Sequence, residues 1–146
     1  MDFQKEIEEE KQRRLDEKEK FKKELYLKSG LLCLHLTKDY RREEYWKLGR
    51  LEQSGESFDT KYKRRELENN LDLGVFILDA DNRKYFKIYQ ITEDDDPQIH
   101  AFVDFTDGMV YKPRSESSAN RKLGWDIDLC LKVADWHGYY LNKDPE

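Results

Sequence analysis

The chain has 146 residues, of which 40% are charged, 37% hydrophobic and 13% aromatic, and its formal net charge is −5. This length suits one ordinary domain plus an appendage. Residues 1–71 hold 18 basic and 17 acidic side chains, whereas residues 72–146 hold 9 basic and 15 acidic ones. The acidic second half disfavours electrostatic capture of nucleic acid by the whole protein, but a local basic patch could still bind it.

The cysteines and the apolar stretches bear on metal binding and on the compartment. Cys33 and Cys130 lack the spacing of a zinc site and are flanked by leucines, so we expect reduced, buried thiols and neither metal nor cofactor. Met1 leads directly into charged residues, which argues against a signal peptide. The longest apolar stretch, Leu31–Leu34, is too short to cross a membrane. We therefore expect a soluble, cytoplasmic protein without a membrane partner.

The first segment, residues 1–29, is expected to be a long charged helix. Residues 2–28 are rich in Glu, Lys, Arg, Gln and Leu, contain no Pro or Gly, and repeat acidic-to-basic pairs four residues apart. Ser29-Gly30 is a candidate helix end or hinge. Two interpretations stay open: a solvated helix that touches its own domain only near Phe21–Leu27, or a helix that pairs with a partner.

The second segment, residues 30–72, is expected to be helical. Residues 31–53 carry a helical stripe of leucines and tyrosines, although their first residues also alternate as a strand would. A short helix is predicted over 59–69, after the break at Ser54-Gly55 and with Ser57 or Asp59 as its cap.

From residue 73 onward the hydrophobic period changes to two, which predicts an antiparallel sheet domain over 73–146. Strands are expected over 75–78, 85–92, 99–105 and 109–112, as a meander of three or four strands. Residues 114–121 are predicted to form a loop. Trp125–Ala134 fits both a strand and a helix, and its strict alternation favours the strand. The predicted fold class is α+β: N-terminal helices followed by a small antiparallel meander.

The sheet region resembles a family of small uncharacterised bacteriophage proteins over about residues 84–143. The shared pattern is K-Y-x-K-I, then H-A-F-V-D and G-x-V-Y-K-P, and a closing G-x-x-Y-L. It is matched by Lys84–Ile88, His100–Asp104, Gly108–Pro113 and Gly138–Leu141. The loop after Pro113 departs from the family pattern. The resemblance implies a phage or phage-derived accessory protein in the host cytoplasm, and it implies no chemistry.

One candidate site is the basic and aromatic stretch 111–125. Basic side chains interleaved with aromatic ones suit phosphate contact and base stacking. A solvated loop is the alternative interpretation. The candidate binding residues are Tyr111, Lys112, Arg114, Arg121, Lys122 and Trp125.

Two weaker candidates involve carboxylates. His100 and Asp104 are expected on one face of a strand, where with Asp107 they could bind a metal or transfer protons, but turn and ladder roles explain them equally well. The acidic run Glu93–Asp96 lacks the ligand spacing of a calcium loop and is expected to be a solvated turn.

No catalytic motif is present in the sequence. We therefore expect a non-enzymatic accessory protein that binds and occludes a host or phage macromolecule through an aromatic and acidic surface. The N-terminal helices would add contact area or form a homo-oligomer. The alternative is nucleic-acid or nucleotide binding through the loop 111–125 and the basic run Lys61–Arg65.

Overall fold

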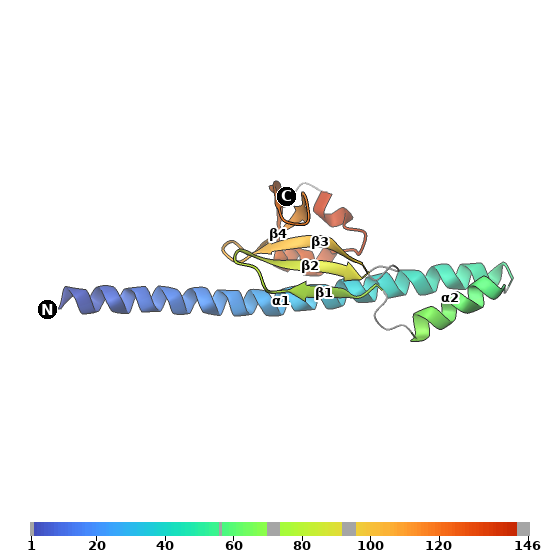
Figure 1. Cartoon of the computed structure of the whole chain (residues 1–146), viewed down its shortest axis with the longest axis horizontal. Helices are drawn as coiled ribbons and strands as arrows, with labels where there is room; N and C mark the ends of the chain where they lie inside the picture. Colours follow the sequence, from blue (N-terminus) through green and yellow to red (C-terminus); the bar gives the residue numbers. More distant parts are fainter. Residues whose placement is uncertain (1, 56, 70–73, 92–95, 143–146) are drawn as a thin grey trace.

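The computed structural model describes residues 2–55, 57–69, 74–91 and 96–142. A long helix lies against one face of a five-stranded antiparallel sheet, and its N-terminal half projects beyond the sheet (Figure 1). The predicted α+β class is confirmed. In chain order the elements are α1 (Phe3–Gln53), α2 (Phe58–Asn69), β1 (Phe76–Asp79), β2 (Tyr85–Ile91), β3 (Pro97–Asp104), β4 (Met109–Pro113), β5 (Ala119–Asp126), α3 (Ile127–Val133) and the 3-10 helix η1 (Tyr139–Asn142).

Helix α1 is continuous over 51 residues. Asp2 caps its N-terminus, since the Asp2 carboxylate accepts hydrogen bonds from the backbone N–H groups of Gln4 and Lys5. The predicted helix end at Ser29-Gly30 is wrong. Ser29 is fully buried against the sheet, and its hydroxyl donates to the Leu25 carbonyl at 2.7 Å. Packing of α1 on the sheet outweighs the cost of about 1 kcal/mol that a glycine imposes on a helix.

The five strands follow one another in the order β1-β2-β3-β4-β5, and every neighbouring pair is antiparallel. The four predicted strands and the short helix near 59–69 are confirmed. The expected loop over 114–121 is right for residues 114–118 and wrong for residues 119–121. Strand β5 begins at Ala119, which pairs with Pro113, and runs on to Asp126.

The strand favoured over Trp125–Ala134 is only partly right. Trp125 belongs to β5, whereas Ile127–Val133 form α3. The change occurs at Asp126, whose carboxylate accepts a 2.8 Å hydrogen bond from the Asp128 backbone N–H and so caps α3. No helix within the described ranges is both long and apolar enough to cross a bilayer.

The core lies between α1 and one face of the sheet. Its α1 side consists of Leu25, Leu32, Cys33, Leu36 and Tyr40, which repeat at helical spacing. The sheet contributes Phe76, Phe86, Ile88, Ala101, Val103, Val110 and Trp125, and the C-terminal segment adds Ile127, Cys130, Ala134, Tyr140 and Leu141. Both cysteines are free and buried, as expected.

Gly74 lets the chain enter β1 directly against Tyr40. It has a φ of +75°, and a Cβ atom at this position would lie 1.9 Å from the Tyr40 ring. Only glycine fits both the left-handed backbone and this close approach.

Candidate functional site

Of the six predicted binding residues, three line one hollow at the β4–β5 end of the sheet. Arg114, Arg121 and Lys122, with Ala119 and Asn120, surround a cavity of about 640 Å³. No carboxylate lines this hollow among the described residues. The other three predicted residues lie elsewhere or in other roles: Tyr111 lies under Arg121, Lys112 donates to Asn142, and Trp125 belongs to the core on the opposite face.

Arg121 is the centre of a polar cluster on the open face of the sheet, the face that α1 does not cover. Its guanidinium donates to Asp104 Oδ2 at 2.6 Å and to the Tyr85 hydroxyl at 2.9 Å, and it lies 4.6 Å from the Tyr111 ring. Asp107 completes the cluster by accepting from the Tyr111 hydroxyl at 2.6 Å. These contacts join β2, β3, β4 and β5.

The electrostatics of this cluster are internally balanced. Burial alone would raise the pKa of Asp104, but hydrogen bonds from Thr106 and from Arg121, together with the charge of Arg121, lower it. Hydrogen bonding to Asp104 and Tyr85 raises the pKa of Arg121. Burial, with the nearby Asp107, raises the pKa of Tyr111 to about 12. The charge of Arg121 is therefore used in contacts within the sheet. Arg114 and Lys122 are the basic side chains of the hollow that remain available to an anion.

His100 and Asp104 do not share a face, contrary to the prediction. A register shift in β3 pairs Ala101 with Ile88 and Ile99 with Tyr89, and so leaves His100 without an opposing residue. His100 consequently points to the core side, 3.1 Å from the Tyr140 hydroxyl, and burial lowers its pKa to about 4.

A metal site in this region gains no support. In the parts of the chain that the structure describes, no group of three or more His, Cys, Asp or Glu side chains could hold a metal ion. Of the predicted acidic turn, Glu93–Asp95 lie outside the described residues.

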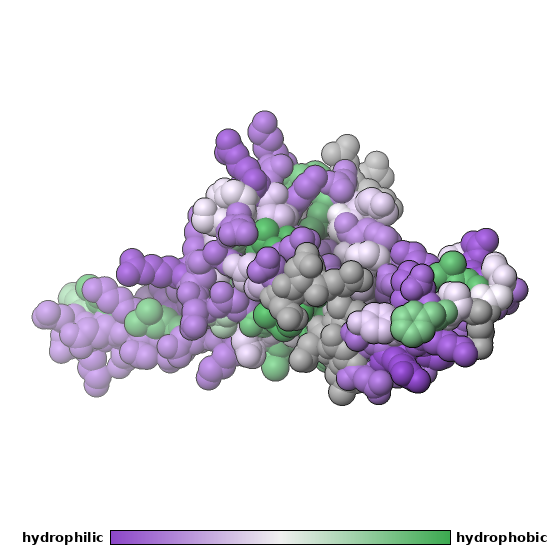
Figure 2. Space-filling model, turned by 45° about the vertical axis from the view of Figure 1, so that its right-hand side comes forward, coloured by the Kyte–Doolittle hydropathy of each residue, from purple (hydrophilic) through white to green (hydrophobic). Residues whose placement is uncertain are grey.

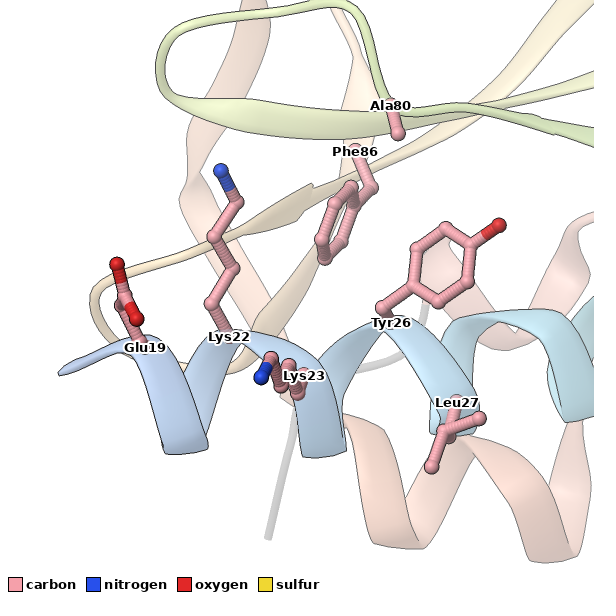
Figure 3. Close-up of a pocket in the computed structure, with 7 residues that line it drawn as sticks. All are labelled: Glu19, Lys22, Lys23, Tyr26, Leu27, Ala80 and Phe86. Carbon is pink, nitrogen blue, oxygen red and sulfur yellow. The ribbon is translucent and has the colours of Figure 1, made fainter. Parts of the chain in front are cut away.

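A groove separates α1 from the β1–β2 hairpin and has a volume of about 610 Å³. Figure 3 shows Phe86 reaching from the sheet toward Tyr26 of α1, with Ala80 above and Lys22 to one side. The Tyr26 and Phe86 rings meet edge to face at 5.6 Å. Phe86 is 1% exposed and Tyr26 49% exposed, so the groove has an aromatic floor and an accessible aromatic wall. Lys22, Lys23 and Glu19 form its rim.

Sequence reasoning missed the groove. Contact between the first helix and its own domain near Phe21–Leu27 was one of the two interpretations, but nothing local to β2 identified Phe86 as the floor of a groove. The groove exists because the β1–β2 hairpin lies beside α1, and this arrangement follows from the topology of the whole chain, which local sequence patterns do not reveal.

The outer face of α1, opposite the sheet, carries a row of three exposed leucines. Leu27, Leu31 and Leu34 are 66%, 56% and 59% exposed, and their spacing of four and three residues places them on one side of the helix. Figure 3 shows Leu27 pointing away from the sheet. By contrast, hydrophilic residues cover most of the projecting N-terminal half of α1, with only isolated hydrophobic side chains among them (Figure 2).

A second cluster attaches the C-terminal segment to α1. Glu43 accepts from the Trp136 indole N–H at 2.5 Å, and its carboxylate lies 2.8 Å from His137 Nε2. The pKa of Glu43 is lowered, since hydrogen bonds from Trp136, His137 and Lys47 outweigh the opposing effect of burial. This cluster is fully occupied by its own contacts and serves packing.

Comparison with known proteins adds one match. The model of a family of unknown function, DUF7717, matches residues 9–143 and so spans the helices as well as the sheet. Searches of curated proteins and of solved structures gave no match.

Proposed function

The chain belongs to DUF7717, a family of unknown function, and we propose that it is a non-enzymatic protein that binds a protein partner in the groove between α1 and the β1–β2 hairpin. The observation that carries this proposal is the half-exposed Tyr26 standing over the buried Phe86. Exposed aromatic side chains beside a buried apolar floor are typical of the anchor positions of protein interfaces.

The rim of the groove indicates the chemistry of the partner. Lys22 and Lys23 outnumber Glu19, so the groove favours a segment with an apolar anchor flanked by carboxylates. The Lys22 ammonium lies 4.4 Å from the centre of the Phe105 ring, which holds its charge close to the apolar floor.

The role of such binding is occlusion: the protein covers a surface of its partner and blocks it. The resemblance of residues 84–143 to small phage proteins supports an accessory role of this kind, exerted on a host or phage protein in the host cytoplasm. The expected aromatic and acidic binding surface is revised in this proposal to an aromatic groove with a basic rim.

Site-specific photo-crosslinking tests this proposal. A photoreactive phenylalanine replaces Tyr26 in one variant and Tyr62, which is 57% exposed on α2, in the control. In lysate of the natural host we expect a discrete adduct from position 26 that is absent from position 62. Lys22→Glu with Lys23→Glu should abolish the adduct, whereas Lys11→Glu with Lys18→Glu on the same helix should not. Identical labelling from positions 26 and 62 would refute the groove.

A second candidate function is supported by the basic hollow. Arg114 and Lys122 border a cavity without a lining carboxylate, as contact with the phosphates of a single strand requires. Fluorescence anisotropy with a labelled single-stranded oligonucleotide tests it. We expect binding that weakens as salt rises, with a slope of log K against log salt of roughly −0.7 per contacted phosphate. Arg114→Glu with Lys122→Glu should remove it, and salt-independent binding would contradict this function.

A further inference from the structure

We propose that two copies of this chain pair through the outer face of α1, antiparallel and about a two-fold axis at Leu31. The seam consists of Glu24, Leu27, Leu31, Leu34 and Lys38. These residues are spaced three, four, three and four apart, which is the repeat that keeps one helix face toward a partner helix. All five are exposed on the single chain.

The charges at the two ends of the seam determine the direction of pairing. In an antiparallel pair centred on Leu31, Leu27 meets Leu34 of the second copy, and Glu24 meets Lys38 of the second copy, so the leucines are closed at each end by an ion pair. A parallel pair would place Glu24 on Glu24 and Lys38 on Lys38. Like charges across a helix seam are unfavourable, and antiparallel pairing is therefore selected.

Two neighbouring cations, Lys28 and Arg41, are held by contacts within their own chain. Lys28, one turn after Glu24, pairs with Asp128 at 2.9 Å. Arg41, the next seam position after Lys38, is bent toward the Leu67 carbonyl of α2. Glu24 and Lys38 are exposed, and neither forms an ion pair within the described part of the chain.

The position of the row along α1 provides the contact area. A stable dimer buries about 800 Å² per partner, more than three leucines supply. Helix α1 runs from Phe3 to Gln53, so the row at residues 27–34 lies near its middle. Antiparallel pairing about Leu31 overlaps residues 9–53 of the two helices, a length of roughly 65 Å at 1.5 Å per residue. Between Arg41 and Glu52 this side of α1 carries α2, through the Arg41 contact with the Leu67 carbonyl and the 2.6 Å pair between Arg64 and Glu52. The projecting half of each α1 would therefore lie along α2 of the other copy, which adds to the contact area of the leucines.

Light scattering during size-exclusion chromatography tests the pairing on the full chain. We expect a particle of twice the 17.7 kDa chain mass at micromolar concentration. Leu31→Lys should raise the dimer dissociation constant by about 100-fold or more, because two buried leucines are lost per dimer. The control is Leu15→Lys, since Leu15 is 55% exposed on the same helix but lies outside the row. Both variants should keep the melting temperature of the monomer fold, because both side chains are exposed.

A charge swap and a crosslink test the direction. Glu24→Lys should weaken the dimer, and adding Lys38→Glu should restore it. A disulfide should form between copies in Leu31→Cys and not in Lys20→Cys, because residue 20 is far from its own counterpart in an antiparallel pair. A monomeric wild type, a dimer that Leu31→Lys leaves intact, or self-crosslinking of Lys20→Cys would each overturn the proposal. Leu27 borders both the groove and the seam, whereas Tyr26 lines only the groove and Leu31 belongs only to the seam. Crosslinking from Tyr26 and the Leu31→Lys variant therefore test the two proposals separately.

Discussion

Arg121 of β5 forms an ion pair with Asp104 at the end of β3, with 2.6 Å between Nη1 and Oδ2. The Asp104 side chain is fully buried, whereas Arg121 is 42% exposed. A buried carboxylate is tolerated only while its partners remain, because an unpaired charge in this position loses its hydration without compensation. A single substitution in this pair should therefore destabilise the open face of the sheet.

Replacing Arg121 by leucine should lower the free energy of unfolding by about 2–3 kcal/mol, because it strands the Asp104 carboxylate. Lys122→Leu, the matched change at the exposed neighbour, should stay within about 0.5 kcal/mol of wild type. Urea unfolding followed by circular dichroism measures both. Asp104→Asn should have its largest effect near neutral pH. That effect should shrink as pH falls through the lowered pKa of Asp104, where the wild-type carboxyl is protonated as well. Equal losses in Arg121→Leu and Lys122→Leu would contradict this view of the pair.

His100 should make the protein sensitive to mild acid. Its pKa is lowered to about 4 in the folded state, against about 6.5 in an unfolded chain. Between these values only the unfolded state binds the proton, so stability should fall by about 2–3 kcal/mol as pH drops from 6.5 to 4, and should be at its full value above pH 6.5.

The His100→Gln variant isolates this effect. It should be less stable at neutral pH, because the contact with Tyr140 is altered, and its stability should depend less on pH over this interval. An unchanged pH profile in His100→Gln would show that another group is responsible.

Gly74→Ala should destabilise the protein by at least about 2 kcal/mol. The φ of +75° at Gly74 disfavours any side chain, and the new Cβ atom would lie 1.9 Å from the Tyr40 ring. Gly49→Ala is the control: Gly49 lies inside α1 with no atom within 4 Å of its Cβ position, so alanine there should stabilise the helix by about 0.5–1 kcal/mol. Thermal unfolding of the two variants should shift in opposite directions. A neutral Gly74→Ala would mean that Tyr40 moves aside without cost.

Both thiols should be unreactive in the folded protein. Cys33 and Cys130 are 6% and 0% exposed, and burial raises the pKa of each to about 12. At pH 8 a thiol reagent such as Ellman's reagent should label neither cysteine in native protein and both in urea. Rapid labelling of one cysteine under native conditions would reveal local opening near it.

The sequence predicted the fold class and four strands because their signals are local: alternation within each strand and turn residues between strands. It did not predict the continuity of α1, because Ser29-Gly30 has the local features of a helix end and only packing on a distant sheet overrides them. The switch from β5 to α3 was marked by a capping aspartate, Asp126, within an otherwise unbroken alternation.

The candidate sites were less accessible to sequence reasoning. Arg121 was identified as a basic residue, but its partner Asp104 lies 17 positions away and is brought near it by the pairing of β3 with β4 and of β4 with β5. The register shift beside His100 places its side chain on the face opposite to the predicted one, and nothing in the sequence indicates this bulge. The groove and the leucine row likewise depend on which face of α1 the sheet covers.

The absence of a break in α1 has a mechanical consequence. The residues that anchor the sheet, from Leu25 to Tyr40, belong to the same helix as the projecting N-terminal half. With no hinge between the two, the projecting half acts as a lever of roughly 30 Å at 1.5 Å per residue. An angular change imposed at its tip is passed along the helix to the sheet, so anything that holds the N-terminal end also influences the orientation of the sheet.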